Sequence, residues 1–189
     1  PQNWDPFSVG VSTADEFLLT DSGVIKDMAE LQGQLFIYST TGISTLQLTG
    51  NATIPIRATV VSNKYGCQVQ SGVTTVKGQH LVVGNQDIYL FSGNPASIQS
   101  VVESRVKRKF FSDVNVLYPE LMFMLHHIQQ HEVWIIYPSV DAVDRHADKA
   151  MIWNYSTNTW SFRDIQQAAA GDICPVPGGG IPTYDARFL

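Results

Sequence analysis

The chain has 189 residues, of which 44% are hydrophobic and 15% are charged, and its formal net charge is −5 at pH 7. This length fits a single domain, and the charged fraction is well below the usual quarter of residues. The negative charge excludes a global field that would attract nucleic acid. Since no apolar run approaches the roughly 20 residues of a membrane span, we expect neither a membrane span nor a signal peptide.

Short strand patterns dominate the chain. They are rich in β-branched and aromatic residues, and turns such as Thr40–Gly42, Gly84–Gln86 and Ser156–Asn158 separate them. In chain order, the predicted strands are Glu16–Thr20, Gln34–Ser39, Ile43–Leu48, Ile54–Val61, Gln79–Val83, Asp87–Phe91, Leu121–His127, Glu132–Tyr137, Ala150–Tyr155 and Thr159–Arg163.

One pattern recurs among these strands: an apolar strand, a tight turn, and a second strand with an aromatic or long apolar residue. The copies begin at Gln34, at His80 and, in a longer form with an insert after Tyr137, at Glu132. Their spacing of about 46 and 52 residues is that of a four-stranded propeller blade. The sequence therefore predicts an all-β fold, a β-propeller of about four blades or part of a larger one, with antiparallel sheets. An irregular β-sandwich is the alternative.

We expect residues 1–189 to form one propeller segment of a longer chain, with one helix near residues 96–110 that decorates a blade. Pro95 follows Asn94, a pair typical of a helix start. Apolar residues then recur at helical spacing on one face. They are Ile98, Val101, Val102, Val106 and Phe110.

The predicted helix carries the only basic run of the chain, formed by Arg105, Lys107, Arg108 and Lys109. In a DNA channel, four cations on one helix would give salt-sensitive, sequence-independent contact with the DNA backbone. A solvated helix face and salt bridges to an adjacent subunit are the alternatives.

Three tryptophans are candidate structural aromatics: Trp134, Trp153 and Trp160. Trp153 and Trp160 flank a turn, so we expect them to meet across it or to pack between blades. Large rigid aromatic rings contribute most where they fill the wedge between adjacent sheets. We expect all three side chains to be largely buried.

Three histidines in a short stretch invite a metal-site hypothesis. Strand alternation puts His126 and His127 on opposite faces, so only one of them can join His131. Because two imidazoles without a third ligand make a weak site, we expect an exposed hairpin tip and no bound metal.

An acidic loop follows Pro138, with Asp141, Asp144, His146 and Asp148. Its spacing is wrong for a calcium loop and the bend glycine is missing, so a solvated loop is expected. The chain has no nucleophile elbow, phosphate-cradling loop or HExxH motif. The sequence therefore predicts a protein that is not an enzyme and holds no cofactor.

The two cysteines, Cys67 and Cys174, lie far apart in the sequence. Their number and spacing match neither a disulfide framework nor a zinc motif. We expect both thiols to be free, as in a protein folded in a cytoplasm.

Four segments carry a resemblance to a known family: Leu31–Leu46, Asn85–Gly93, Glu132–Ser139 and Ile152–Ser161. Their order resembles that in the tail nozzle and head–tail stabilisation proteins of short-tailed double-stranded DNA phages. The resemblance reaches from about Phe17 to Phe162.

That resemblance implies a propeller-bearing virion subunit that rings the DNA channel at the tail tip, usually as a hexamer, and acts in DNA ejection. The implied partners are identical subunits, an adaptor, tail fibres and channel DNA, after assembly in the host cytoplasm. A kelch-like or receptor-binding propeller for a host glycan or protein is the alternative. The kelch pattern is weaker because the only glycine run, Gly178–Gly180, lies downstream of Trp160. A propeller hydrolase is the third hypothesis, but no tryptophan lies in a sialidase-type box.

Overall fold

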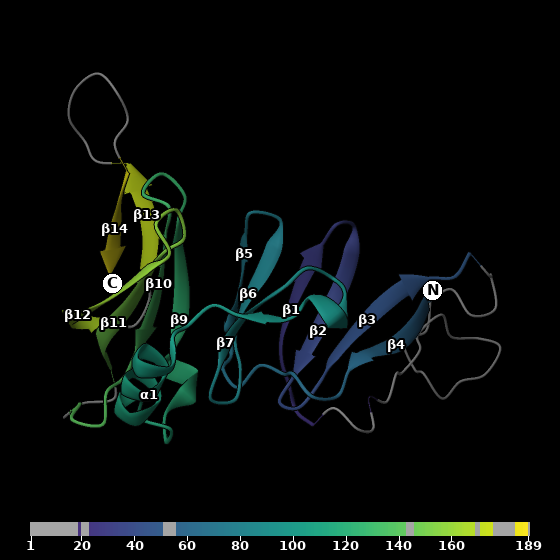
Figure 1. Ribbon diagram of the computed structural model, residues 1–189, viewed down its shortest axis with the longest axis horizontal. Coiled ribbons are helices and arrows are strands. Elements are labelled where there is room, and N and C mark those ends of the chain that lie inside the picture. Colours follow the sequence, from purple (N-terminus) through teal and green to yellow (C-terminus); the bar gives the residue numbers. More distant parts are fainter. Residues whose placement is uncertain are drawn as a thin grey trace, which may run out of the picture.

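The computed structural model describes residues 19, 23–50, 56–142, 146–168, 171–175 and 184–188. Beyond residue 165 it describes the backbone alone. The described residues form three four-stranded antiparallel sheets, a two-stranded hairpin and one α-helix (Figure 1). The predicted all-β class with four-stranded antiparallel sheets is confirmed.

Each four-stranded sheet pairs its strands in chain order, so every strand hydrogen-bonds to its sequence neighbours. The first sheet contains β1 (Ile25–Leu31), β2 (Gln34–Ser39), β3 (Ile43–Leu48) and β4 (Ile56–Ser62). The second contains β5 (Val73–Val76), β6 (Gln79–Val83), β7 (Ile88–Phe91) and β8 (Gln99–Ser100). The third contains β9 (Phe123–His127), β10 (Glu132–Tyr137), β11 (Ala147–Asn154) and β12 (Thr159–Ala168), and the hairpin pairs β13 (Gly171–Pro175) with β14 (Tyr184–Phe188).

The repeat is more regular in the structure than in the sequence. The first strands of the three sheets begin at Ile25, Val73 and Phe123, and β13 begins at Gly171, a recurrence every 48 to 50 residues. β5 lies beside β1 and beside β9, and β13 and β14 both lie beside β9. The hairpin therefore stands where a fourth repeat of the same kind would begin.

Most predicted strands are present within two or three residues of their expected ends. Glu16–Thr20 lies outside the described residues, except for Leu19, which is not in a strand. The sequence patterns missed β1, β5, β8, β13 and β14. In β1 the apolar signal is weak because Lys26, Asp27 and Glu30 interrupt it.

The prediction of a helix at residues 96–110 was wrong about where the helix begins. Pro95–Ser97 form a short 3₁₀ turn, capped by the Asn94 side chain, which accepts a hydrogen bond from the backbone N–H of Ala96 at 2.9 Å. The chain then enters β8, and Val101 N–H donates to the Ile88 carbonyl at 3.1 Å. Because the second sheet holds these residues extended, α1 spans Ser104–Asp113.

The second sheet packs on the first sheet through one face and on the third sheet through the opposite face. We call the front face of a sheet the one that packs on the next sheet in the chain, and the back face the one that packs on the preceding sheet. The first core lies between the front of the first sheet (Phe36, Tyr38, Ile43) and the back of the second (Val82, Tyr89, Phe91). The second core lies between the front of the second sheet (Leu81, Val83, Ile88) and the back of the third (Val133, Ile135, Tyr137, Met151, Trp153).

A buried polar relay joins the first two sheets. Tyr38 Oη lies 2.6 Å from His80 Nδ1, and His80 Nε2 lies 2.9 Å from the Glu30 carbonyl oxygen. A carbonyl can only accept, so Nε2 carries the proton and Nδ1 accepts the hydrogen bond that the Tyr38 hydroxyl donates. Burial lowers the pKa of His80, which keeps this neutral tautomer in place.

The relay predicts an acid-sensitive fold. The pKa of His80 is lowered in the fold, so the unfolded chain takes up the proton first and the stabilisation is lost as pH falls below about 6.5. We expect the free energy of unfolding in urea to fall between about pH 7.5 and pH 5.5.

Two variants test the source of that pH dependence. His80→Gln should reduce the fall in the free energy of unfolding with falling pH. The part of the fall that remains comes from His126, because burial also lowers the pKa of His126. His146→Asn, at an exposed histidine, should keep the full fall. An unchanged curve for His80→Gln would show that the relay is not its cause.

Candidate functional site

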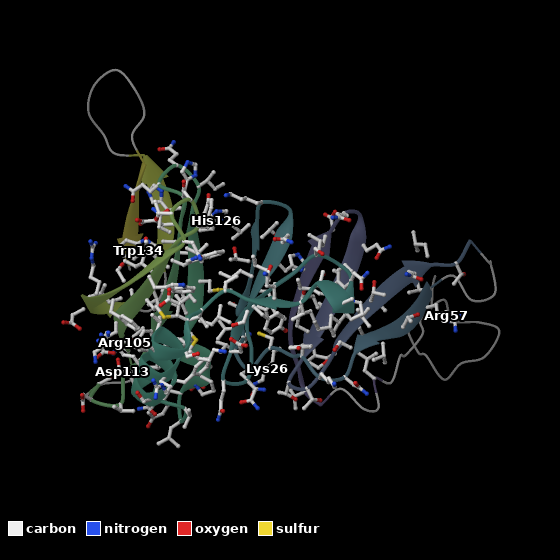
Figure 2. The ribbon with its side chains drawn as sticks, in the orientation of Figure 1. Lys26, Arg57, Arg105, Asp113, His126 and Trp134 are labelled. Carbon is white, nitrogen blue, oxygen red and sulfur yellow. The ribbon has the colours of Figure 1, made fainter. Side chains whose placement is uncertain are left out.

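Helix α1 braces the second and third sheets, and its apolar face explains why it docks there. Phe110 is fully buried, and its ring meets that of Tyr137 edge to face at 4.9 Å. At the end of the helix, the Asp113 carboxylate accepts a hydrogen bond from the Tyr137 hydroxyl at 2.9 Å and lies 2.9 Å from Lys149 Nζ. Figure 2 shows Arg105 and Asp113 on this helix, at one end of the molecule.

The structure divides the predicted basic set into two pairs. Lys107 Nζ forms a salt bridge with Asp87 at 2.8 Å, and Lys109 Nζ lies 4.0 Å from the centre of the Phe162 ring. Both contacts tie α1 to neighbouring sheets. Arg105 and Arg108 are exposed and form no salt bridge with any carboxylate among the described residues. These two arginines are the ones free to meet a phosphate or a second subunit.

The three tryptophans occupy two different layers. Trp153 and Trp160 face each other across β11 and β12 and stack at 5.7 Å with a 15° angle between their rings. Trp160 Nε1 also donates to the Val101 carbonyl at 3.2 Å, so the pair links the third sheet to the second repeat. Trp134 lies on the front face of the third sheet. Trp134 and Trp153 are buried, whereas Trp160 is only partly buried.

The three histidines do not form an exposed hairpin tip. The Tyr155 hydroxyl lies between His126 Nε2 at 3.2 Å and His131 Nδ1 at 3.4 Å. His127 is buried on the opposite face of β9, and its Nδ1 accepts a hydrogen bond from Gln130 N–H at 3.3 Å. Only His131 is exposed. The described residues contain no group of three or more His, Cys, Asp or Glu that could hold a metal ion.

The acidic loop is partly structural. Asp148 accepts hydrogen bonds from the Ser139 backbone N–H at 2.6 Å and the Ser139 hydroxyl at 2.7 Å, which closes the loop. The expectation of a solvated loop is therefore wrong for Asp148, which is half-buried. Asp141 and His146 are exposed, and Asp144 lies outside the described residues.

Cys67 is a buried free thiol in the first core. Its S–H donates to the Val69 carbonyl at 3.0 Å, and burial raises its pKa to about 12. A thiol in such surroundings is inert, and its role is packing. The side chain of Cys174 lies outside the described residues.

A polar hollow of about 400 Å³ opens at the turns of the first two sheets, and the sequence patterns did not predict it. Tyr65 lies in this hollow and is 39% exposed, and its ring lies 5.5 Å from the ring of Tyr89. The hollow is also lined by turn residues that bear amides or hydroxyls: Thr40, Thr41, Asn63, Asn85 and Gln86. Side-chain amides beside an exposed ring suit a polyhydroxyl or peptide ligand. Turn residues carry no signal for such a site, because the same residues are needed to make turns.

Comparison with known proteins adds no relative. No family model matches the chain, and no curated protein sequence matches it. In the described part of the chain, no helix combines the length and the apolar character needed to cross a membrane.

The Asp113–Lys149 pair predicts a measurable coupling between α1 and the third sheet. Lys149→Met and Asp113→Asn should each destabilise the chain, since each leaves a partly buried polar partner without its charge-assisted bond. In a double-mutant cycle by urea unfolding, we expect a coupling of about 1 kcal/mol. A matched cycle of Lys149→Met with Asp141→Asn, at an exposed residue, should give no coupling. Equal coupling in both cycles would contradict the brace.

Proposed function

We propose that this chain is part of a β-propeller that serves as a structural subunit of a phage tail nozzle. It acts through assembly with identical subunits around a DNA channel, and it carries out no catalysis.

One observation carries the propeller part of the proposal: the first strands β1, β5 and β9 lie side by side, and each begins a four-stranded sheet stacked on the next. In propellers the first strand of each blade lies nearest the central axis. The start of β13 beside β9 continues the series. The sandwich alternative requires two stacked sheets, and three sheets in succession favour blades.

The side chains favour assembly over catalysis. The candidate acid–base groups are engaged in structural contacts: His126 with Tyr155, Asp148 with Ser139, and His80 with Tyr38. Exposed apolar side chains are concentrated in the first sheet, at Ile25, Met28, Leu35, Leu48 and Val60. Exposed apolar surface of this extent is typical of protein–protein contact. The assignment to a tail nozzle rests on the sequence resemblance.

Ring formation is the direct test of this proposal. At micromolar concentrations of the purified chain, negative-stain electron microscopy should show closed rings, and light scattering should give a mass of several chains. A monomer at every concentration would contradict the proposal.

Contact with channel DNA makes a second test. The double variant Arg105→Glu with Arg108→Glu should weaken binding to random-sequence duplex in fluorescence anisotropy. The slope of log affinity against log salt should fall by about two, since two phosphate contacts are lost. The control double variant, Arg57→Glu with Lys64→Glu, makes the same charge change at exposed residues outside α1. Equal effects in both would show that only net charge matters.

A second candidate function is recognition of a host glycan or protein, favoured by the polar hollow around Tyr65. If this is the function, the chain should bind a glycan array, and Tyr65→Ala should abolish that binding. Tyr118→Ala, at a partly buried tyrosine that does not line the hollow, is the control.

A further inference from the structure

Two imidazoles and a phenol converge where two turns of the third sheet meet. The Tyr155 hydroxyl oxygen lies 3.2 Å from His126 Nε2 and 3.4 Å from His131 Nδ1. His126 belongs to β9, His131 to the turn between β9 and β10, and Tyr155 to the turn between β11 and β12. His126 pairs with Val133, a residue of the second core, so the cluster stands at the junction of the second and third sheets.

The atoms around the Tyr155 hydroxyl are spaced more widely than hydrogen bonding requires. Its two imidazole neighbours and the Ile128 carbonyl oxygen lie 3.2 to 3.4 Å away. A hydroxyl has one proton to donate, and it usually lies about 2.7 to 2.8 Å from an oxygen that accepts it. The buried Tyr38 hydroxyl, in contrast, lies 2.6 Å from His80 Nδ1. Hydrogen bonding alone therefore does not account for the geometry around Tyr155.

The spacing matches the ligand shell of a tetrahedral zinc ion. Zinc binds imidazole nitrogen at about 2.0 to 2.1 Å, which sets neighbouring ligand atoms of a tetrahedron about 3.3 Å apart. The two distances from the Tyr155 oxygen, 3.2 Å and 3.4 Å, lie on either side of this value. A square-planar copper(II) site with bonds of similar length needs neighbouring ligands about 2.8 Å apart. The geometry therefore favours zinc.

The backbone of the second sheet orients the His126 ring as a metal ligand requires. The Thr75 carbonyl of β5 accepts a hydrogen bond from this ring. Since Nε2 faces the Tyr155 oxygen, Nδ1 is the nitrogen that donates, and Nε2 keeps its lone pair. Histidines that bind metals are usually held by such a bond from the other ring nitrogen. His131 is exposed, which gives an ion a path from the solvent.

We propose that His126 Nε2, His131 Nδ1 and Tyr155 Oη bind a zinc ion, with water as the fourth ligand. The imidazoles coordinate in their neutral forms, and the phenol releases its proton to the solvent as the metal binds. The exposed Lys77 ammonium lies 5.1 Å from the centre of the Tyr155 ring, where solvent screens its repulsion of the ion.

This site goes beyond the proposed function. The ion joins the two turns at this end of the third sheet, so its role is to stabilise the sheet. The sequence patterns missed the site because its third donor is a phenol that lies 24 residues after His131 in the chain.

Titration of the full chain with zinc chloride tests the site. The chain should carry no histidine tag, and every variant should carry Cys174→Ser, because a thiol also binds zinc. Isothermal titration calorimetry should show one ion per chain. His131→Gln and Tyr155→Phe should each weaken binding at least about tenfold, as the loss of a group that supports a metal does. His146→Gln, at an exposed histidine, and Tyr118→Phe are the matched controls and should bind zinc with full affinity.

Two further readouts do not depend on affinity alone. Cobalt(II) in place of zinc should give the strong visible absorption of a four-coordinate ion. Excess zinc should raise the urea midpoint of the unmodified chain, since it binds the folded state, and should leave that of His131→Gln unchanged.

The outcomes that would overturn the site are distinct. The proposal fails if the unmodified chain binds no zinc, or if cobalt shows only the weak bands of a six-coordinate ion. Full affinity in Tyr155→Phe would mean that the phenol is no ligand, and full affinity in His131→Gln would place the ion elsewhere. Each of these results leaves the proposed function standing, because ring formation tests it separately.

Discussion

Front-to-back packing of consecutive sheets is the constraint on which the rest of the structure depends. A four-stranded antiparallel sheet buries its apolar side chains only where another layer covers them. In the first interface the rings of Phe36 and Phe91 meet edge to face at 5.1 Å. The Tyr38–His80 relay beside them satisfies its polar atoms only in this one register. Aromatic area supplies stabilisation, and the buried relay fixes how the two sheets align.

The same constraint accounts for the side chains that otherwise suggest chemistry. His80 and Asp113 are each held at a junction between repeats or between a helix and a sheet. The salt bridge between Lys107 and Asp87 has the same structural role, since it holds α1 against the second sheet. Three surfaces take no part in this packing: Arg105 with Arg108 on the helix, the polar hollow, and the exposed apolar side chains of the first sheet. These surfaces, rather than any catalytic group, carry the functional proposals.

The sequence predicts those parts of the fold whose signal is local. The Gln34–Ser39 strand and its partner Ile43–Leu48 are rich in apolar and β-branched residues and flank a glycine turn, and both were predicted to the residue. The start of α1 was not predictable from periodicity, because Ile98 and Val101 satisfy a helical spacing while β8 and the second sheet hold them extended. Pairing of side chains from distant repeats, such as Trp160 with Val101, leaves no local pattern. The sequence therefore predicted which basic residues α1 carries. The structure was needed to show that Lys107 and Lys109 are engaged in contacts whereas Arg105 and Arg108 form no salt bridge with a described carboxylate.

The central claim, that side chains packed between consecutive sheets hold those sheets together, is tested most directly by a double-mutant cycle on Phe36 and Phe91. Both are buried in the first core, one from each sheet. Urea unfolding of the two alanine variants and the double variant should give a coupling of about 1 kcal/mol. The matched cycle of Phe36 with Phe110, which lies in the second core, should be additive within about 0.5 kcal/mol. Additivity of Phe36 with Phe91 would contradict the account.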